Sequence, residues 1–178
     1  MKKILLATAS LLLVAQMAFA DRPFQAALLP DVAIVPRGEP VRGVALNIWG
    51  ENEVRGLSFG FVNGHVGESM GLSWSYIGTY AEDYTGVIWG GFFAYTTGDV
   101  VGWQSAFANI NRGSFTGLQT GFLNYGNEVK GLQLGFVNYA ENLHGVQVGF
   151  ANIARNNAWF TGLPRDLATG FPFVNWSF

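Results

Sequence analysis

The 178-residue sequence predicts an all-β protein of about ten short strands, built from repeats of 14–16 residues. Three observations support this fold class. A short motif recurs along most of the chain, bulky apolar and slim residues alternate within each copy, and charged residues are absent from the same segments. Recurrence at a short fixed period is typical of repeat folds, and alternation with period two is typical of strands.

The amino-terminal segment, residues 1–20, has the three parts of a secretory signal peptide. A basic start at 1–3 precedes an apolar run over 4–17, and Ala18-Phe19-Ala20 forms an A-x-A cleavage site. The apolar run is shorter than the roughly 20 residues that a transmembrane helix needs. We therefore expect an exported protein whose mature chain, residues 21–178, is a single β-repeat domain.

The composition restricts the class of protein. Charged residues make up only 12% of the chain, against about 25% in an average soluble domain, while 24 glycines and 15% aromatic residues are present. This mixture is typical of outer-membrane β proteins. The formal net charge is −2 and Lys130 is the only lysine after residue 20, which argues against a nucleic-acid partner. Without cysteine the chain has neither disulfides nor thiolate metal sites.

The repeat units begin with glycine, and the clearest copies read GLQTGFLNYGNEVK and GLQLGFVNYAENLH. The eight unit starts are Gly43, Gly56, Gly71, Gly86, Gly102, Gly117, Gly131 and Gly145. Two further strand-like pieces flank the repeats: residues 24–35, broken by Pro30, and a carboxy-terminal strand over 171–178. Turn-forming residues such as Gly, Asn, Asp and Thr join the apolar runs.

Within a unit, alternation gives a bulky apolar face and a slimmer face. In the seventh unit Leu134 and Phe136 point one way, and Gln133, Gly135 and Val137 point the other. The third position forms a predicted polar ladder of Gln104, Gln119, Gln133 and Gln147, and the eighth a predicted ladder of Asn63, Asn109, Asn124, Asn138 and Asn152. Such amides either satisfy neighbouring polar groups or line a polar conduit or binding strip, and we favour the first role.

Charge is strictly sorted along the repeat. The first eight residues of the eight units, 64 residues together, contain no Asp, Glu, Lys or Arg. Average usage would place about 16 charged residues in a window of that size. Charged residues are therefore confined to the connections and to the ends of the chain.

Two architectures fit these patterns. The preferred one is a closed antiparallel up-and-down barrel in the outer membrane, because uncharged strands of about nine residues suit a bilayer that penalises charge by about 2–4 kcal/mol near its midplane. Its bulky face would meet lipid. The alternative is a β-solenoid with one coil per unit, in which identical residues stack on each other. A solenoid would leave a charge-free face in water, which is unusual for a soluble protein.

The G-[LV]-Q-x-G-F-x-N units, the opening VRGVALNIWGENEVRGLSFGFVN and the ending FPFVNWSF resemble a family of bacterial surface-repeat proteins best known from leptospires. The resemblance spans nearly all of residues 24–178. It implies an exported envelope protein and no particular reaction. The units over 71–116 depart from the pattern, most at Ile88 and Phe93, which puts uniform stacking in question there.

No constellation of catalytic, cofactor-binding or metal-binding residues is visible. The two histidines, His65 and His144, lie in connections and are expected to be exposed turn residues. We therefore expect a non-enzymatic cell-envelope protein at the outer membrane or cell surface, with a structural or interaction role and the membrane as its partner. The alternative is a soluble periplasmic or extracellular solenoid that binds a protein or a glycan.

Overall fold

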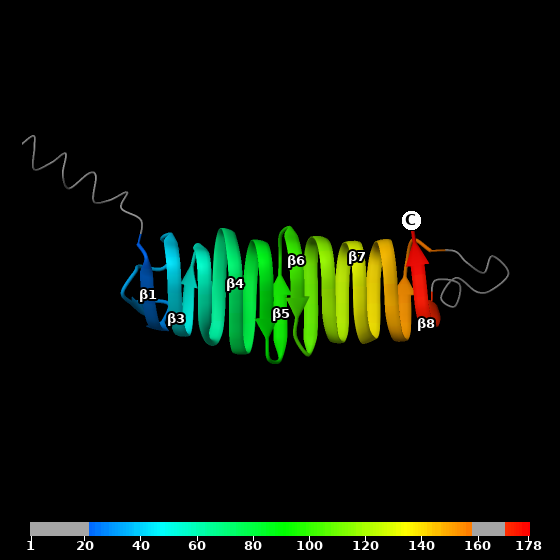
Figure 1. Cartoon of the computed structure of the whole chain (residues 1–178), viewed down its shortest axis with the longest axis horizontal. Helices are drawn as coiled ribbons and strands as arrows, with labels where there is room; N and C mark the ends of the chain where they lie inside the picture. The colour runs from blue at the N-terminus through cyan, green and yellow to red at the C-terminus, as the bar shows by residue number, and fades with distance from the viewer. Residues whose placement is uncertain (1–21, 158–169) are drawn as a thin grey trace, which may run out of the picture.

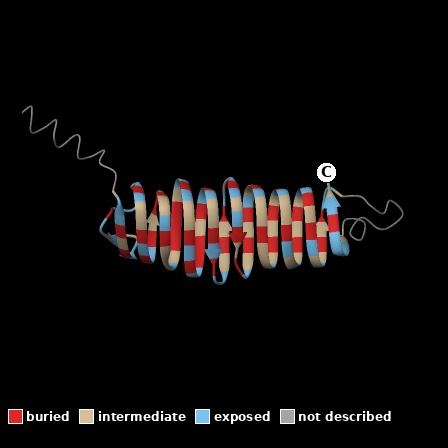
Figure 2. Cartoon of the chain, in the orientation of Figure 1, coloured by how far each residue is buried: buried red, intermediate tan, exposed pale blue. Residues whose placement is uncertain are grey.

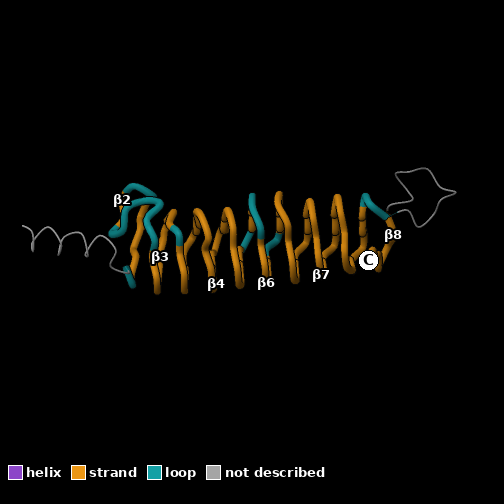
Figure 3. Tube along the Cα trace, turned by 90° about the horizontal axis from the view of Figure 1, so that it is seen from above, coloured by secondary structure: helices purple, strands orange, loops and turns teal. Residues whose placement is uncertain are grey.

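The chain forms a β-solenoid, a ribbon that coils repeatedly around one long axis (Figure 1). The structure is a computed structural model and describes residues 22–157 and 170–178. The predicted signal peptide, residues 1–20, lies outside the described residues. Viewed from above, successive coils follow one another along the axis, and β2 with its adjoining loops lies at the amino-terminal end (Figure 3).

The all-β prediction is confirmed for the described residues, which contain strands and no helix. The strands are β1 (Phe24–Leu29), β2 (Val32–Ala33), β3 (Val41–Asn52), β4 (Val54–Gly90), β5 (Phe93–Thr96), β6 (Val100–Ser105), β7 (Ala108–Ala154) and β8 (Gly170–Ser177). Strands β4 and β7 are 37 and 47 residues long, so each continues through several repeat units. They remain extended where the chain bends from one side of a coil to the next.

Neighbouring units pair in parallel, and equivalent residues lie side by side. Gly43 pairs with Gly56, and Gly102 pairs with both Gly86 and Gly117. The preferred antiparallel barrel is therefore wrong, and the solenoid alternative describes the chain. The physical reason is that parallel stacking gives every copy of the motif the same surroundings, whereas antiparallel neighbours would impose two inverted environments on one motif.

The two ends of the solenoid use different pairings. At the amino-terminal end β1 pairs in parallel with β3 and antiparallel with the short β2. At the other end β8 pairs antiparallel with the last part of β7, so that Val146 lies opposite Trp176. These flanking strands cover the backbone groups that the outermost coils would otherwise leave unpaired.

The middle of the solenoid is less regular than the coils on either side of it. Strand structure is interrupted at residues 91–92, 97–99 and 106–107. The register nevertheless continues across the interruptions, because Ile88 pairs with Gln104 and Phe93 pairs with Ala108. The departures from the motif thus loosen the strands locally and leave the stacking of the coils intact.

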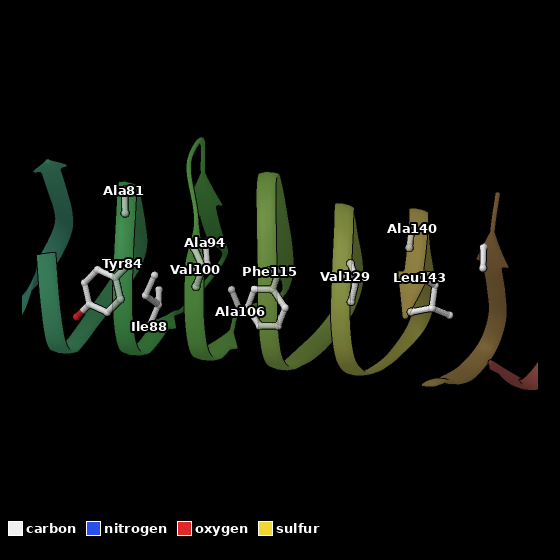
Figure 4. Close-up of a cluster of buried hydrophobic side chains, with 11 residues drawn as sticks. Ala81, Tyr84, Ile88, Ala94, Val100, Ala106, Phe115, Val129, Ala140 and Leu143 are labelled. Carbon is white, nitrogen blue, oxygen red and sulfur yellow. The ribbon is translucent and has the colours of Figure 1, made fainter. Parts of the chain in front are cut away.

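The interior of the coils is narrow and mixed in character. Buried and exposed residues alternate along each coil (Figure 2). A row of buried apolar side chains follows the axis, with Ile88, Phe115 and Leu143 among the largest (Figure 4). Beside it lie fully buried amides, including the four repeat glutamines. The bulky Phe and Trp residues of the motif do not fill this interior.

Candidate functional site

The glycine that opens each unit allows the coils to approach each other closely. Gly117 has a φ of 136°, a region that side-chain-bearing residues rarely adopt, and a Cβ added there would lie 2.0 Å from the carbonyl oxygen of Gly102. Gly131 and Gly145 repeat the same contact with the preceding unit. The first position of the motif is therefore glycine for both steric and conformational reasons.

The glutamines of the third position form one continuous row of hydrogen bonds inside the coils. The Nε2 atom of Gln133 donates to Oε1 of Gln119 over 2.7 Å, and Gln147 donates to Gln133 over the same distance. Gln119 donates to Gln104, and Asn175 of β8 donates to Gln147. Gln147 also reaches across its coil to the carbonyl of Ile153, so the length of the glutamine side chain matches the width of the interior.

The asparagines of the eighth position form a second row. Asn109 donates to Asn124, Asn124 to Asn138, and Asn138 to Asn152, over 2.7–2.8 Å. Asn138 also donates to the carbonyl of Gly135 in its own coil, a hydrogen bond that spans the sixth and seventh positions. Neighbouring amide groups crowd the fifth position, and a Cβ on Gly135 would lie 2.4 Å from Nδ2 of Asn124.

Asn63 lies apart from the other four asparagines. It accepts a hydrogen bond from Asn47 and donates to the hydroxyl of Ser73. Beyond it a row of hydroxyls continues, in which Ser73 and Ser75 each contact Thr79. All three hydroxyls belong to the third unit, whose eighth position is Gly78 instead of asparagine.

Both amide rows are buried, with the repeat glutamines fully inaccessible to solvent. Their donors are used by the next amide in the row or by backbone carbonyls. Such rows, like the amide ladders of stacked β-structures, hold adjacent coils in register. They leave no open polar strip along the axis, and the surface that faces solvent consists of other positions of the motif.

The sixth position forms an exposed apolar row along the solenoid. Its members are Ile48, Phe61, Tyr76, Phe107, Phe122, Phe136 and Phe150, all exposed, and the equally exposed Phe92 continues the row from the seventh position of the fourth unit, whose sixth residue is Gly91. The last four sixth-position residues stack face to face, with ring centroids 4.9–5.0 Å apart and interplanar angles of 1–9°. This spacing follows from the distance between adjacent strands, about 4.7–4.9 Å.

A second exposed row lies at the fourth position, two residues before the sixth position in each unit. It contains Leu46, Trp74, Trp89, Leu134 and Val148. Charged residues lie elsewhere on each coil, in the connection that follows the eighth position. There Glu82 accepts a hydrogen bond from the backbone of Gly67, and Asp99 accepts one from the backbone of Ser114. Each coil therefore presents an uncharged apolar part and a charged part.

An open groove separates the two apolar rows in the first three units. Leu46, Phe59 and Trp74 form one wall and Ile48, Phe61 and Tyr76 form the other, enclosing about 690 Å³. A second hollow continues it toward Trp89 and Phe92. We call the first of these two hollows the apolar groove, and we call the two exposed rows together the apolar face.

The prediction that His65 is exposed is wrong. His65 is 1% exposed and lies inside the coil, where its Nε2 is 2.9 Å from the hydroxyl of Ser73. Burial lowers the pKa of His65 to about 3. His65 occupies the tenth position of its unit, which is a buried alanine at Ala140 and Ala154, and this equivalence is the sequence signal that could have revealed it. His144 is exposed, as expected.

We expect acid to destabilise the fold through His65. The folded state holds this imidazole neutral down to a pH of about 3, whereas the unfolded chain binds a proton below about 6.5. The free energy of unfolding should therefore fall by about 2 kcal/mol between pH 7 and pH 5. Urea unfolding of the wild type and of His65→Phe at both pH values measures this change in the free energy of unfolding. His144→Gln is the control, and we expect it to lose as much stability as the wild type. An equal loss in His65→Phe would contradict the assignment.

Among residues 22–157 and 170–178, no group of three or more His, Asp or Glu side chains is arranged to hold a metal ion. In the same residues no helix is long and apolar enough to cross a membrane. Comparisons with protein-family models, with curated proteins and with solved structures found no match to this chain. Its function must therefore be argued from the solenoid itself.

Proposed function

We propose that the protein is a non-enzymatic, exported protein that attaches to a lipid surface of the cell envelope through its apolar face. The observation that carries this proposal is the eight-member exposed row, formed by seven sixth-position residues and Phe92, which no charged residue interrupts. Contiguous exposed apolar surface of this kind marks an interaction site in soluble proteins. The resemblance to bacterial surface-repeat proteins supports the same location, at the outer membrane or the cell surface.

A lipid surface suits the backbone as well as the side chains. In a parallel solenoid the N–H and C=O groups pair between neighbouring coils, so the apolar face carries few unpaired backbone groups into an apolar medium. Tryptophan and tyrosine, which favour the membrane–water interface, occur on the face at Trp74, Tyr76 and Trp89. The charged part of each coil would remain in water, as in an interfacial amphipathic element.

A glycan fits the same face less well. Sugars stack on the open faces of aromatic rings, but Phe107, Phe122, Phe136 and Phe150 cover one another's faces at 4.9–5.0 Å. These rings present mainly their edges to the outside. The aromatic row thus offers little open ring surface to a sugar.

A protein partner would meet a different difficulty. The face repeats the same residue types at each coil, so a partner could slide by one coil and meet nearly the same surface. Specific protein interfaces rely instead on a few distinct anchors set in a polar rim. A fluid lipid surface requires no register, and it is the partner that suits a periodic apolar face.

Flotation with phosphatidylcholine vesicles tests the proposal. We expect the wild-type protein to rise with the vesicles and Phe136→Glu to lose at least about tenfold in partition coefficient, because burying a phenylalanine contributes about 1.5–3 kcal/mol and a carboxylate opposes insertion. Phe136 lies between Phe122 and Phe150 in the exposed row and is 47% exposed, so the substitution does not place a carboxylate in the interior.

His144→Glu provides the matched control, because it adds the same carboxylate to the same repeat unit but in the charged part of the coil. We expect it to float like the wild type. Circular dichroism of both variants reports whether the solenoid is intact. A wild-type protein that stays with the lipid-free fraction, or equal losses in the two variants, would rule out attachment through this face.

A further inference from the structure

We propose that the apolar groove of the first three units binds one acyl chain of a membrane phospholipid. This inference rests on the proposed attachment to a lipid surface and assigns to the groove a role distinct from that of the rest of the face. The exposed row can contact a bilayer along its whole length, whereas the groove is an open channel between two walls that we expect to accept a single hydrocarbon chain.

The shape of the groove favours a linear ligand. Its two walls are rows of side chains that run along the solenoid axis, and the fifth position, with Asn47 and Gly60, forms its floor. Its volume of about 690 Å³ lies in the range of about 300–1,000 Å³ that is usual for small-molecule sites. The second hollow extends the same channel beyond Trp74.

The chemistry of the walls favours hydrocarbon over peptide. No charged side chain lines the groove, and the amide nitrogen of Asn47 on its floor is turned inward to Asn63 Oδ1 at 3.0 Å. An extended peptide would bring a backbone N–H or C=O group at every residue and would leave many of them unpaired, which is costly in an apolar site. An acyl chain brings no such groups.

The groove is local because of the residues at the fourth position. In the first three units this position holds Leu46, Phe59 and Trp74, which are large enough to form a wall. In the fifth and sixth units it holds Ser105 and Thr120, which are too short to face the phenylalanine row as a wall. The fourth position is apolar again at Leu134 and Val148 of the last two units, so Ser105 and Thr120 separate the groove from the carboxy-terminal part of the apolar face.

Titration with a short-chain lysophosphatidylcholine below its micelle-forming concentration tests the inference in the absence of a bilayer. We expect saturable binding of one lipid per chain by calorimetry, with a shift of tryptophan emission that disappears in Trp74→Phe. Leu46→Glu, which places a carboxylate in one wall, should weaken binding at least about tenfold. Leu46 is 46% exposed, so this substitution leaves the interior of the coil untouched.

Leu134→Glu is the matched control, because Leu134 holds the same fourth position outside the groove and is 36% exposed. It should bind the lysolipid like the wild type. Absence of saturable binding, equal weakening in both variants, or tighter binding of an extended apolar peptide than of the lysolipid would overturn the acyl-chain site. If the protein floats with vesicles but does not bind lysolipid, only the acyl-chain site is refuted. If it binds lysolipid but does not float, only the proposed membrane attachment is refuted.

Discussion

Replacing Gly117 by alanine is expected to prevent the solenoid from folding or to destabilise it by more than about 4 kcal/mol, which places it among the most damaging single substitutions. The new Cβ would lie 2.0 Å from the carbonyl oxygen of Gly102, and both partners are backbone held by strand pairing. The backbone at Gly117, with φ 136°, is also unfavourable for alanine. Neither difficulty can be relieved without separating two coils. Thermal and urea unfolding followed by circular dichroism measures the effect.

Gly38→Ala separates the two contributions to this effect. Gly38 also has a positive φ, 78°, but nothing lies within 4 Å of an added Cβ. We expect this variant to lose only about 1 kcal/mol, the cost of an unfavourable backbone conformation without a steric clash. If the two variants were equally stable, close stacking of the glycines would not be what fixes the distance between coils.

Replacing Gln133 by leucine is expected to cost about 3 kcal/mol, because it interrupts the glutamine row in the middle. The Oε1 atom of Gln119 would lose the hydrogen bond that Nε2 of Gln133 donates to it. The Nε2 atom of Gln147 would lose Oε1 of Gln133, one of its two acceptors. Both neighbours are fully buried, so water cannot replace the missing partners. Chemical denaturation at neutral pH gives the change in free energy of unfolding.

Asn142→Leu is the control for this substitution. It lies in the same repeat unit and exchanges an amide for the same apolar side chain, but Asn142 is exposed. We expect a change within about 0.5 kcal/mol, as for most surface substitutions. A Gln133→Leu protein as stable as the Asn142→Leu protein would show that the glutamine row contributes nothing to the cohesion of the coils.

The strand pieces at the two ends illustrate what local sequence predicts well. Residues 24–35 were expected to be extended and broken by Pro30, and the structure has β1 and β2 on either side of this proline. The strand expected over 171–178 is β8, Gly170–Ser177. Local signals suffice here because alternation and turn residues act within a few positions of one another.

The position of Asn138 illustrates what local alternation misses. In one straight strand, period two would place Asn138 on the same side as Phe136. In the structure Leu134 and Phe136 are both exposed, so the alternation continues across Gly135. Asn138 is nevertheless buried, because the alternation changes phase at Val137, between Phe136 and Asn138. The prediction for His65 was wrong for a related reason. The connection in which His65 lies is itself an extended strand, and one side of this strand faces the interior.

The sequence by itself determined that this is an all-β repeat protein, which residues recur at each position, and that charge is confined to one part of every unit. Those properties follow from composition and spacing along the chain. Only the tertiary structure decided that the units stack in parallel, that the two amide rows lie inside and that the phenylalanines of the exposed row lie outside. Period-two alternation is the same in parallel and antiparallel sheets, so the direction of pairing depends on contacts between residues 13–16 positions apart, such as Gly117 against Gly102.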